Sequence, residues 1–264
     1  MSNSRLGDAL PSYKKPPVNE VVFGMQFNTP ENFYIPHIGI LWDKFRSDYP
    51  VLNHAPTITS SKGQIKIDAA TGVPIPRVWF INNSDDELVQ FQVDRFYFNW
   101  RHRKSDYPRY EFLKEKFVTV LTNVNSFFNE FNFGNIDPTE FELTYINHIP
   151  KGEGWDSFDE LPNIFSDFNW TFKEERFLPN PQKISWSTEF LLPSDMGRLL
   201  VTLKLAVRAD DKNPLLVLEL KSLGSIETNS KEEIIDWFNI SREWIVRGFT
   251  DITTPSIQKI WEIE

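Results

Sequence analysis

Alternation of apolar and polar positions is clearest in the stretch from Leu88 to Arg101. Apolar residues occupy every second position, first in one phase and then in the other: Val89, Phe91 and Val93, then Phe96, Phe98 and Trp100. A period of two is typical of a β-strand with one buried face. The phase changes at Asp94–Arg95, where a one-residue β-bulge would return all six apolar side chains to the same face. We therefore predict one long, central, bent strand.

Further patterns along the chain predict the other elements. Period-two alternation predicts strands at 20–27, 77–82, 140–149, 184–192, 199–208, 215–221 and 257–263. Spacings of three and four predict helices at 37–47, 108–131 and 156–168. Ser230 and Glu233 form a capping box that opens a further long helix. Residues 51–76 are rich in turn formers and predict a flap or an added hairpin.

The order of these elements predicts an α+β fold. Each half contains a β-hairpin, a long helix and a following strand, and the first half in full reads β-α-β-β-α-β. We expect two similar halves, each an antiparallel sheet with a long helix packed on one face. The expected boundaries are a flexible N-terminal arm at 1–18, the first half at 19–150, and a second half at 151–264 that reads α-β-β-β-α-β.

Composition adds an excess of aromatic residues to this picture. The chain of 264 residues has 23 Phe, 9 Trp and 7 Tyr, which together make 15% of the sequence. Aromatic side chains bury large areas, so part of the excess is expected in the core. The remainder is available for a binding surface, because Trp and Tyr are enriched at interfaces.

Net charge and cysteine content limit the classes of partner. A formal net charge of -9 argues against non-specific binding to nucleic acids or anionic membranes. Without cysteine, the chain has neither disulfides nor thiolate ligands. The first residues have no apolar segment of signal-peptide type, and no run is long enough to span a bilayer. We expect a cytoplasmic protein that does not associate with membranes.

Catalytic motifs do not emerge from the sequence. The phosphate-binding patterns G-x-x-x-x-G-K-[ST] and G-x-G-x-x-G and the nucleophile elbow G-x-S-x-G do not occur. The four histidines, His37, His54, His102 and His148, are scattered without metal-ligand spacing. The acidic pairs at 85–86 and 210–211 fall in expected hairpin turns, which explains them without catalysis. We predict no catalytic residue, no metal ligand and no cofactor, and we favour a protein without enzymatic activity.

A cationic cluster is the most informative polar feature. Its members are Arg95, Arg101, His102, Arg103, Lys104 and Arg109, around the end of the alternating stretch and the start of the long helix. Cations beside a helix N-terminus are suited to a phosphate or an acidic partner. The alternative is a solvated strand end whose charges pair with Asp94, Asp106 and Glu111.

Four aromatic residues are candidates for the lining of a ligand pocket: Trp79, Phe96, Phe98 and Trp100. A curved sheet with a helix across it can enclose an apolar pocket, which keeps small-ligand binding open by analogy of fold. Simple packing in the core is the alternative for each of them.

Several short stretches resemble an uncharacterised, sporadically distributed prokaryotic protein family. They are Pro16–Phe23, Tyr49–Pro50, the strand with Phe96 and Trp100, Tyr107–Phe117, Leu143–Asn147 and a C-terminal part with Phe249, Thr253 and Trp261. The resemblance carries no activity and no catalytic residues. The patchy occurrence of the family implies an accessory or regulatory subunit of a mobile defence or toxin–antitoxin cassette.

Together these observations favour a non-enzymatic interaction or regulatory protein, with a protein partner or a second copy of the chain. One alternative is a small-ligand-binding or hydrolytic domain with its pocket between the helix and the aromatic sheet. A second alternative is nucleic-acid binding through the basic residues 101–104, which would be sensitive to salt.

Overall fold

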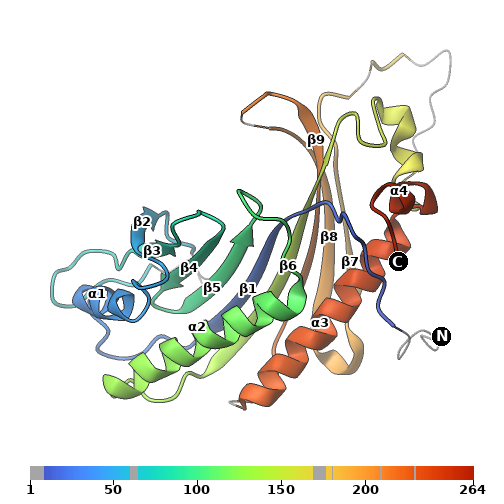
Figure 1. The fold of residues 1–264 in the computed structure, drawn as a ribbon. Coiled ribbons are helices and arrows are strands. Elements are labelled where there is room, and N and C mark those ends of the chain that lie inside the picture. Colours follow the sequence, from blue (N-terminus) through green and yellow to red (C-terminus); the bar gives the residue numbers. More distant parts are fainter. Residues whose placement is uncertain (1–8, 60–64, 169–176, 180, 209, 229) are drawn as a thin grey trace. The chain divides into compact units, whose positions relative to one another are not determined.

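A computed structural model describes residues 9–59, 65–168, 177–179, 181–208, 210–228 and 230–264. These residues form an α+β fold with a nine-stranded antiparallel sheet, in the order β2-β3-β4-β5-β1-β6-β9-β8-β7 (Figure 1). The strands are β1 (Val18–Phe27), β2 (Val51–Ala55), β3 (Arg77–Ile81), β4 (Glu87–Gln92), β5 (Arg95–Arg101), β6 (Pro138–Pro150), β7 (Ser185–Leu191), β8 (Arg198–Val207) and β9 (Pro214–Gly224). The α-helices are α1 (Ile35–Asp43), α2 (Tyr110–Glu130), α3 (Lys231–Ile252) and α4 (Pro255–Ile260), and the 3-10 helices are η1 (Phe158–Asn163) and η2 (Pro193–Asp195).

The chain divides into two compact units. Unit 1 comprises Met1–Val18, Tyr145–Ser222 and Phe238–Glu264, and unit 2 comprises Asn19–Thr144 and Leu223–Trp237. The division passes through β6 and through α3, so each of these elements contributes to both units. The existence of two similar halves, and the boundaries expected for them, stay predictions.

The stretch from Leu88 to Arg101 is a β-hairpin, and our prediction of one bulged strand is wrong. β4 and β5 pair antiparallel, with Gln92 opposite Arg95, so Val93 and Asp94 form a two-residue turn. In this register Phe91 lies opposite Phe96, and directly paired residues point to the same face of a sheet. A hairpin therefore gives the same phase change as a bulge and places the same apolar residues on one face.

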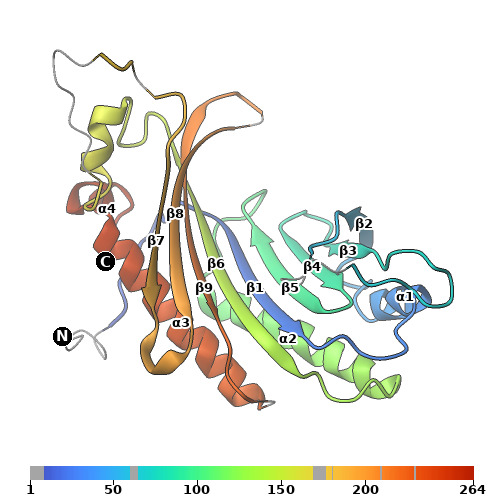
Figure 2. The same ribbon diagram turned by 180° about the vertical axis from the view of Figure 1, so that it is seen from behind.

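Helix α2 lies across one face of the unit 2 sheet, as Figures 1 and 2 show from the two sides, and buried aromatic side chains occupy that face. Phe23 of β1 pairs with Phe98 of β5 in the sheet, and both side chains are 0% exposed. Phe117 of α2 stacks on Phe23 and on Phe96, with ring centres 5.3 and 5.9 Å apart. The spacing predicts an apolar stripe from Leu113 to Phe131: its members Leu113, Phe117, Val120, Leu121, Val124, Phe127 and Phe128 are buried, whereas Phe131 follows the last residue of the helix and is half-buried.

Unit 1 contains the antiparallel pair β7–β8 and most of α3. The alternation predicts one buried face from Leu199 to Val207 of β8: Leu199, Val201 and Leu203 are buried, whereas Leu205 is half-buried and Val207 is 59% exposed. A Cβ atom at Gly248 of α3 would lie 3.2 Å from Leu199 Cδ2, so the glycine allows the helix to approach β8 closely. At the start of α3, in the part that belongs to unit 2, Ser230 Oγ accepts from the Glu233 backbone N–H (3.4 Å), but the Ser230 backbone N–H donates to Thr228 Oγ1 (2.9 Å), so only one half of the predicted capping box forms.

Two predictions for unit 1 need correction. The final strand expected at 257–263 is the helix α4, because Thr254 accepts from Ile257 N–H as N-cap and Pro255 occupies the first turn. The helix expected at 156–168 is only the short 3-10 helix η1. Residues near the N-terminus dock beside α4, since the backbone N–H of Lys15 donates to Trp261 O (3.1 Å).

Within the described ranges, none of the helices has the length and apolar character to cross a membrane.

Candidate functional site

The second face of the unit 2 sheet, which we call the polar face, carries amide and guanidinium groups. The paired register places on it Glu20, Trp79, Gln90, Gln92, Arg95, Tyr97, Asn99 and Arg101. A solvated sheet face normally exposes such side chains, yet Gln90, Arg95 and Asn99 are only 7%, 5% and 3% exposed. Burial of polar groups requires partners, so the hydrogen bonds of this face decide its chemistry.

One row of hydrogen bonds crosses four strands of the polar face. Asn99 Nδ2 of β5 donates to Glu20 Oε1 of β1 (2.6 Å), and Gln90 Nε2 of β4 donates to Asn99 Oδ1 (2.7 Å). Arg77 of β3 continues the row, with Nη2 donating to Gln90 Oε1 and Nη1 donating to the Pro56 carbonyl oxygen (3.3 Å). Each amide both donates and accepts, which fixes its orientation.

A second group holds the segment after β2 against the same face. Gln92 Nε2 donates to the Ile58 carbonyl oxygen, and Gln92 Oε1 accepts from the Ile58 backbone N–H, both at 2.9 Å. The side-chain amide of Gln92 thus both donates to and accepts from the backbone of Ile58, as the backbone of a paired strand does. Gln92 also donates to Asp94 (2.9 Å), which receives Nε and Nη2 of Arg95 at 3.1 and 2.9 Å.

Gly24 of β1 makes room for the aromatic ring of this face. Tyr97 lies opposite Gly24 in the register, and a Cβ atom at Gly24 would be 2.4 Å from Cδ1 and Cε1 of the ring. No real side chain fits at that distance. The ring therefore covers bare backbone, which buries Tyr97 to 8% exposure.

Three N–H groups of unit 2 are shielded from solvent and have no acceptor among the described residues. They are Arg77 Nε, Trp79 Nε1 and Arg101 Nε. Arg77 and Trp79 are two positions apart on β3, and the guanidinium carbon of Arg77 lies 5.6 Å from the Trp79 ring centre. A buried donor without an acceptor costs about 1–3 kcal/mol. All three groups are donors, so this face lacks acceptors.

Arg77 carries a charge that the described residues do not neutralise. Its hydrogen-bond acceptors, Gln90 Oε1 and the Pro56 carbonyl, are both neutral. Burial lowers the pKa of Arg77 below its ordinary value; Tyr97 opposes this shift, and the positive charge of Arg95 adds to it. By contrast, Arg95 has the carboxylate of Asp94, and hydrogen bonds and charge from Asp94 raise its pKa despite burial.

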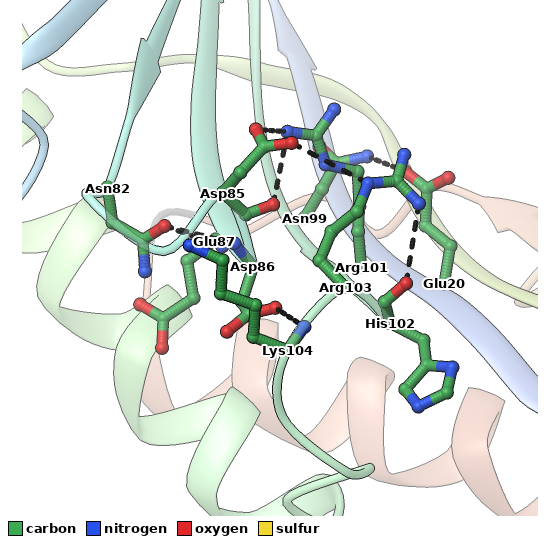
Figure 3. A network of polar contacts seen from close by, with 10 residues as sticks. All are labelled: Glu20, Asn82, Asp85, Asp86, Glu87, Asn99, Arg101, His102, Arg103 and Lys104. Atoms are coloured by element: carbon green, nitrogen blue, oxygen red, sulfur yellow. Dashed lines mark hydrogen bonds and ion pairs between the residues drawn. The ribbon is translucent and has the colours of Figure 1, made fainter.

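A separate group of charges, the β5-end cluster, comprises Asp85, Asp86, Arg101, His102, Arg103 and Lys104 (Figure 3). Asp85 Oδ1 accepts from Arg101 Nη2 (2.5 Å), and Asp85 Oδ2 lies 3.6 Å from Arg103 Nε. Asp85 has a positive φ of 64°, which is a turn conformation that Asp tolerates. One carboxylate is thus shared by two guanidinium groups.

Asp86 binds the loop that connects β5 to α2. Its side chain is 6% exposed, and Oδ1 accepts from the Lys104 backbone N–H (2.8 Å). Burial raises the pKa of this carboxyl, but hydrogen bonds from Lys104, Ser84 and Ser105 outweigh it and leave the pKa below its ordinary value. A structural role explains this acidic residue.

The structure brings together only part of the predicted cationic cluster. Arg101, His102, Arg103 and Lys104 are neighbours, whereas Arg95 closes the hairpin turn at the other end of β5. Seven residues of strand span about 20 Å. Arg109 precedes the first turn of α2 with a φ of 76°.

The four predicted pocket residues lie on two opposite faces of the sheet, and the pocket itself stays a prediction. Phe96, Phe98 and Trp100 are 0%, 0% and 1% exposed on the aromatic face, where α2 packs on them. Trp79 lies on the polar face, where its register partner is Gln90. Sequence reasoning missed the row through Gln90 and Asn99. The sequence does contain an indication of this row. Gln90 and Asn99 are uncharged amides at positions where a solvated sheet face would carry lysines and glutamates.

The accessible margin of the polar face is β2, the strand at one end of the sheet order. Asn53 and Ala55 of β2 lie opposite Trp79 and Arg77 of β3. Val51 and Leu52 are 48% and 41% exposed, and the next two residues are exposed as well. The open edge of the sheet is thus adjacent to the two orphan donors of β3.

Chemistry that needs clustered histidines or carboxylates finds no support in the part of the chain that the structure describes. No group of three or more His, Asp or Glu side chains there could hold a metal ion. His54 is exposed on β2, and His37 Nδ1 accepts from the Tyr34 backbone N–H (2.9 Å). The arrangement offers hydrogen-bond donors and an open strand edge, which are means of recognition.

No protein-family model matches the chain, and no curated protein matches it.

Proposed function

We propose that the protein is a non-enzymatic interaction protein that binds a partner at the edge strand β2 of unit 2. The observation that carries this proposal is the exposure of β2, which ends the sheet order with exposed apolar side chains at Val51 and Leu52. An edge strand presents backbone N–H and C=O groups to which an extended segment of a partner can pair.

The backbone of β2 directs N–H groups away from β3. The His54 N–H donates to the Asn53 side chain (2.8 Å), so it points away from β3. Backbone direction alternates along a strand, so the N–H of Leu52 points the same way. Pro50 and Pro56 flank the strand and limit the pairing edge to its five residues.

The bonded row behind β2 supports this edge. Arg77 on β3 is fixed by Gln90, and Gln90 is fixed by Asn99. A strand that is held in place before binding loses less conformational freedom when a partner adds to it. The polar face therefore stabilises the geometry that a partner strand would recognise.

The alternative of a ligand pocket between α2 and the sheet receives less support. The rings of Phe23, Phe96 and Phe117 fill that interface in stacked pairs. We therefore place the binding surface at β2 and not beneath the helix.

Site-specific photo-cross-linking tests the proposal. A photoreactive residue in place of Leu52 should cross-link a discrete partner in the native host, and Leu52→Pro should abolish that binding without unfolding the chain. Proline is tolerated where the N–H of an edge strand faces solvent. A photoreactive residue at Leu191, which is 77% exposed on β7, is the control. Equal cross-linking from both positions would count against β2.

The same experiment addresses the accessory role that the family resemblance implies. Identification of the cross-linked protein by mass spectrometry shows whether it is a toxin or a defence effector. A second copy of this chain would instead indicate a homo-oligomer.

The finer fold hypothesis of two similar halves is also kept as a proposal. It is supported by the order of elements, because β4 and β5 precede α2 as β8 and β9 precede α3. Amide hydrogen exchange would test it: similar halves should open as two cooperative groups, one around each long helix. A single group common to both helices would contradict it.

A further inference from the structure

The donors next to β2 indicate what kind of partner segment fits there. Arg77 Nε and Trp79 Nε1 both lack an acceptor among the described residues, and Arg77 also lacks a neutralising carboxylate. From this geometry we propose that Arg77 and Trp79 form a carboxylate-binding subsite for an extended, acidic partner segment paired with β2. The proposal rests on the proposed function, because it names the chemistry of the segment that β2 binds.

The number and type of donors match a carboxylate. A carboxylate has two oxygens that only accept, and the subsite offers two N–H groups on separate side chains. Hydrogen bonds to an ionised group are about twice as strong as neutral ones. A neutral amide would supply only one acceptor oxygen and would bring an N–H group toward Arg77.

The spacing of the strands allows a partner side chain to reach this subsite. A segment paired with β2 would lie two strand spacings, or about 10 Å, from β3. Ala55 is directly opposite Arg77 and carries only a methyl group at that position. A glutamate on the partner strand and the long side chain of Arg77 together span that distance.

One existing contact is well suited to exchange for the carboxylate. Arg77 Nη1 reaches the Pro56 carbonyl at 3.3 Å, which is long for an N–H···O hydrogen bond. The contact with Gln90 can persist while this neutral carbonyl is replaced. Binding therefore requires a shift of the chain at Pro56 and leaves the row across β4 and β5 intact.

The overall net charge of -9 does not oppose a local acidic contact. Charges farther away than about 8 Å are largely screened at physiological ionic strength. Arg77 has no carboxylate among its hydrogen-bond acceptors, Gln90 and the Pro56 carbonyl. A partner carboxylate would supply the counter-ion that these neutral acceptors do not.

A pair of matched peptides provides the test in the full-length protein. The probes are capped pentapeptides of alternating Thr and Val with a central Glu, or with a central Gln as control. Chemical shifts of the β2 amides report strand pairing, and the Trp79 indole N–H, assigned with Trp79→Phe, reports the subsite. The indole of Trp155, which already donates to the Ile149 carbonyl (3.1 Å), is the internal reference.

The proposal predicts that the Glu peptide binds about tenfold more tightly than the Gln peptide, a difference of about 1.4 kcal/mol, because an ionised acceptor forms the stronger hydrogen bonds. Only the Glu peptide should shift the Trp79 indole signal. The preference should disappear in Trp79→Phe and in Arg77→Lys, whose folding is checked by their melting temperatures.

The outcomes separate the subsite from the proposed function. Equal affinity for both peptides, with an unmoved Trp79 indole, would overturn the subsite and leave strand pairing at β2 in place. Sodium acetate at constant ionic strength, with sodium chloride as control, tests the subsite alone. A Trp79 shift with acetate but no change of the β2 amides with either peptide would support the subsite and overturn the proposed function. No response to any probe would overturn both.

Discussion

One face of the unit 2 sheet buries the aromatic residues Phe23, Phe96 and Phe98 beneath α2. The opposite face buries the polar residues Gln90 and Asn99 almost as completely. The first set is held by ring packing, with Phe117 stacked on Phe23 and Phe96. The second set is held by hydrogen bonds that run from Glu20 to Arg77. Two faces of the same strands thus reach similar burial through different interactions.

The two faces differ in whether they contain hydrogen-bond donors that have no acceptor. On the aromatic face, Phe23, Phe96 and Phe117 pack on one another without polar groups that need partners. On the polar face the row is satisfied as far as Gln90, but Arg77 and Trp79 at its margin retain donors without acceptors among the described residues. The first face is held by packing, whereas the second face has donors available for an added acceptor. This asymmetry is why we place the interaction surface at β2.

Removing a ring from the aromatic face should have the largest effect. Phe117→Ala takes away a side chain that is 0% exposed and leaves a cavity against Phe23 and Phe96. We expect a loss of about 3–5 kcal/mol in the free energy of unfolding. Urea denaturation measures it. A loss near zero would show that α2 does not pack on the sheet as described.

The close approach of Tyr97 to the backbone should give the next largest effect. Gly24→Ala places a Cβ atom 2.4 Å from the Tyr97 ring, and we expect a destabilisation of about 1–3 kcal/mol. Gly39→Ala in α1 is the matched control, because a Cβ atom there meets nothing within 4 Å. That variant should be stabilised by about 0.5–1 kcal/mol. Equal stabilities of the two variants would contradict the placement of the ring.

Two tryptophans allow a comparison of an indole N–H that has an acceptor with one that has none among the described residues. Trp155→Phe leaves the Ile149 carbonyl without its partner and should cost about 1–3 kcal/mol. Trp79→Phe removes a donor without an acceptor and should change stability by no more than about 0.5 kcal/mol. Thermal unfolding of both variants checks the difference. Comparable losses in the two would mean that the Trp79 N–H already has a partner.

The smallest expected effect concerns pH on the aromatic side. The His37 ring lies 5.1 and 5.2 Å from those of Phe133 and Phe131, and burial lowers the pKa of His37 below 6.5. The folded state therefore binds fewer protons than the unfolded state, so stability falls as the pH drops below about 6.5. This decline ends at the lower pKa of the folded state.

A matched variant isolates the contribution of His37. In His37→Gln the side-chain oxygen can still accept from the Tyr34 N–H, as in a capping box, but it does not titrate. Melting temperatures between pH 7.5 and 5 should fall less in this variant than in the wild type. Identical pH profiles would contradict the assignment.

The sequence predicts strands and their buried faces better than it predicts the connections. Alternation identified the aromatic face correctly. The turn Val93–Asp94 was not predicted, because it contains neither Gly nor Asn and has no positive φ. The helix α4 carries a visible signal in Thr254–Pro255, yet the short apolar run after it fits a strand equally well.

The candidate site was predictable only in part. Residues 101–104 are adjacent in the sequence, so their closeness in space could be predicted from it. The row from Glu20 to Arg77 joins residues of four strands, and its order depends on which strands are adjacent in the sheet. The orphan donors depend on atomic burial, which periodicity does not specify. Position along the chain therefore could not reveal the subsite.

The most direct measurement of the central claim is amide hydrogen exchange at Leu52 in the full-length protein. The rate is compared with and without the capped Glu pentapeptide at saturating concentration, with the amide of Leu191 on β7 as control. Strand pairing at β2 predicts that exchange at Leu52 slows by at least about tenfold, because its N–H becomes hydrogen-bonded, while Leu191 is unchanged. An unchanged rate at Leu52, or equal slowing at Leu191, would contradict partner binding at the edge strand β2.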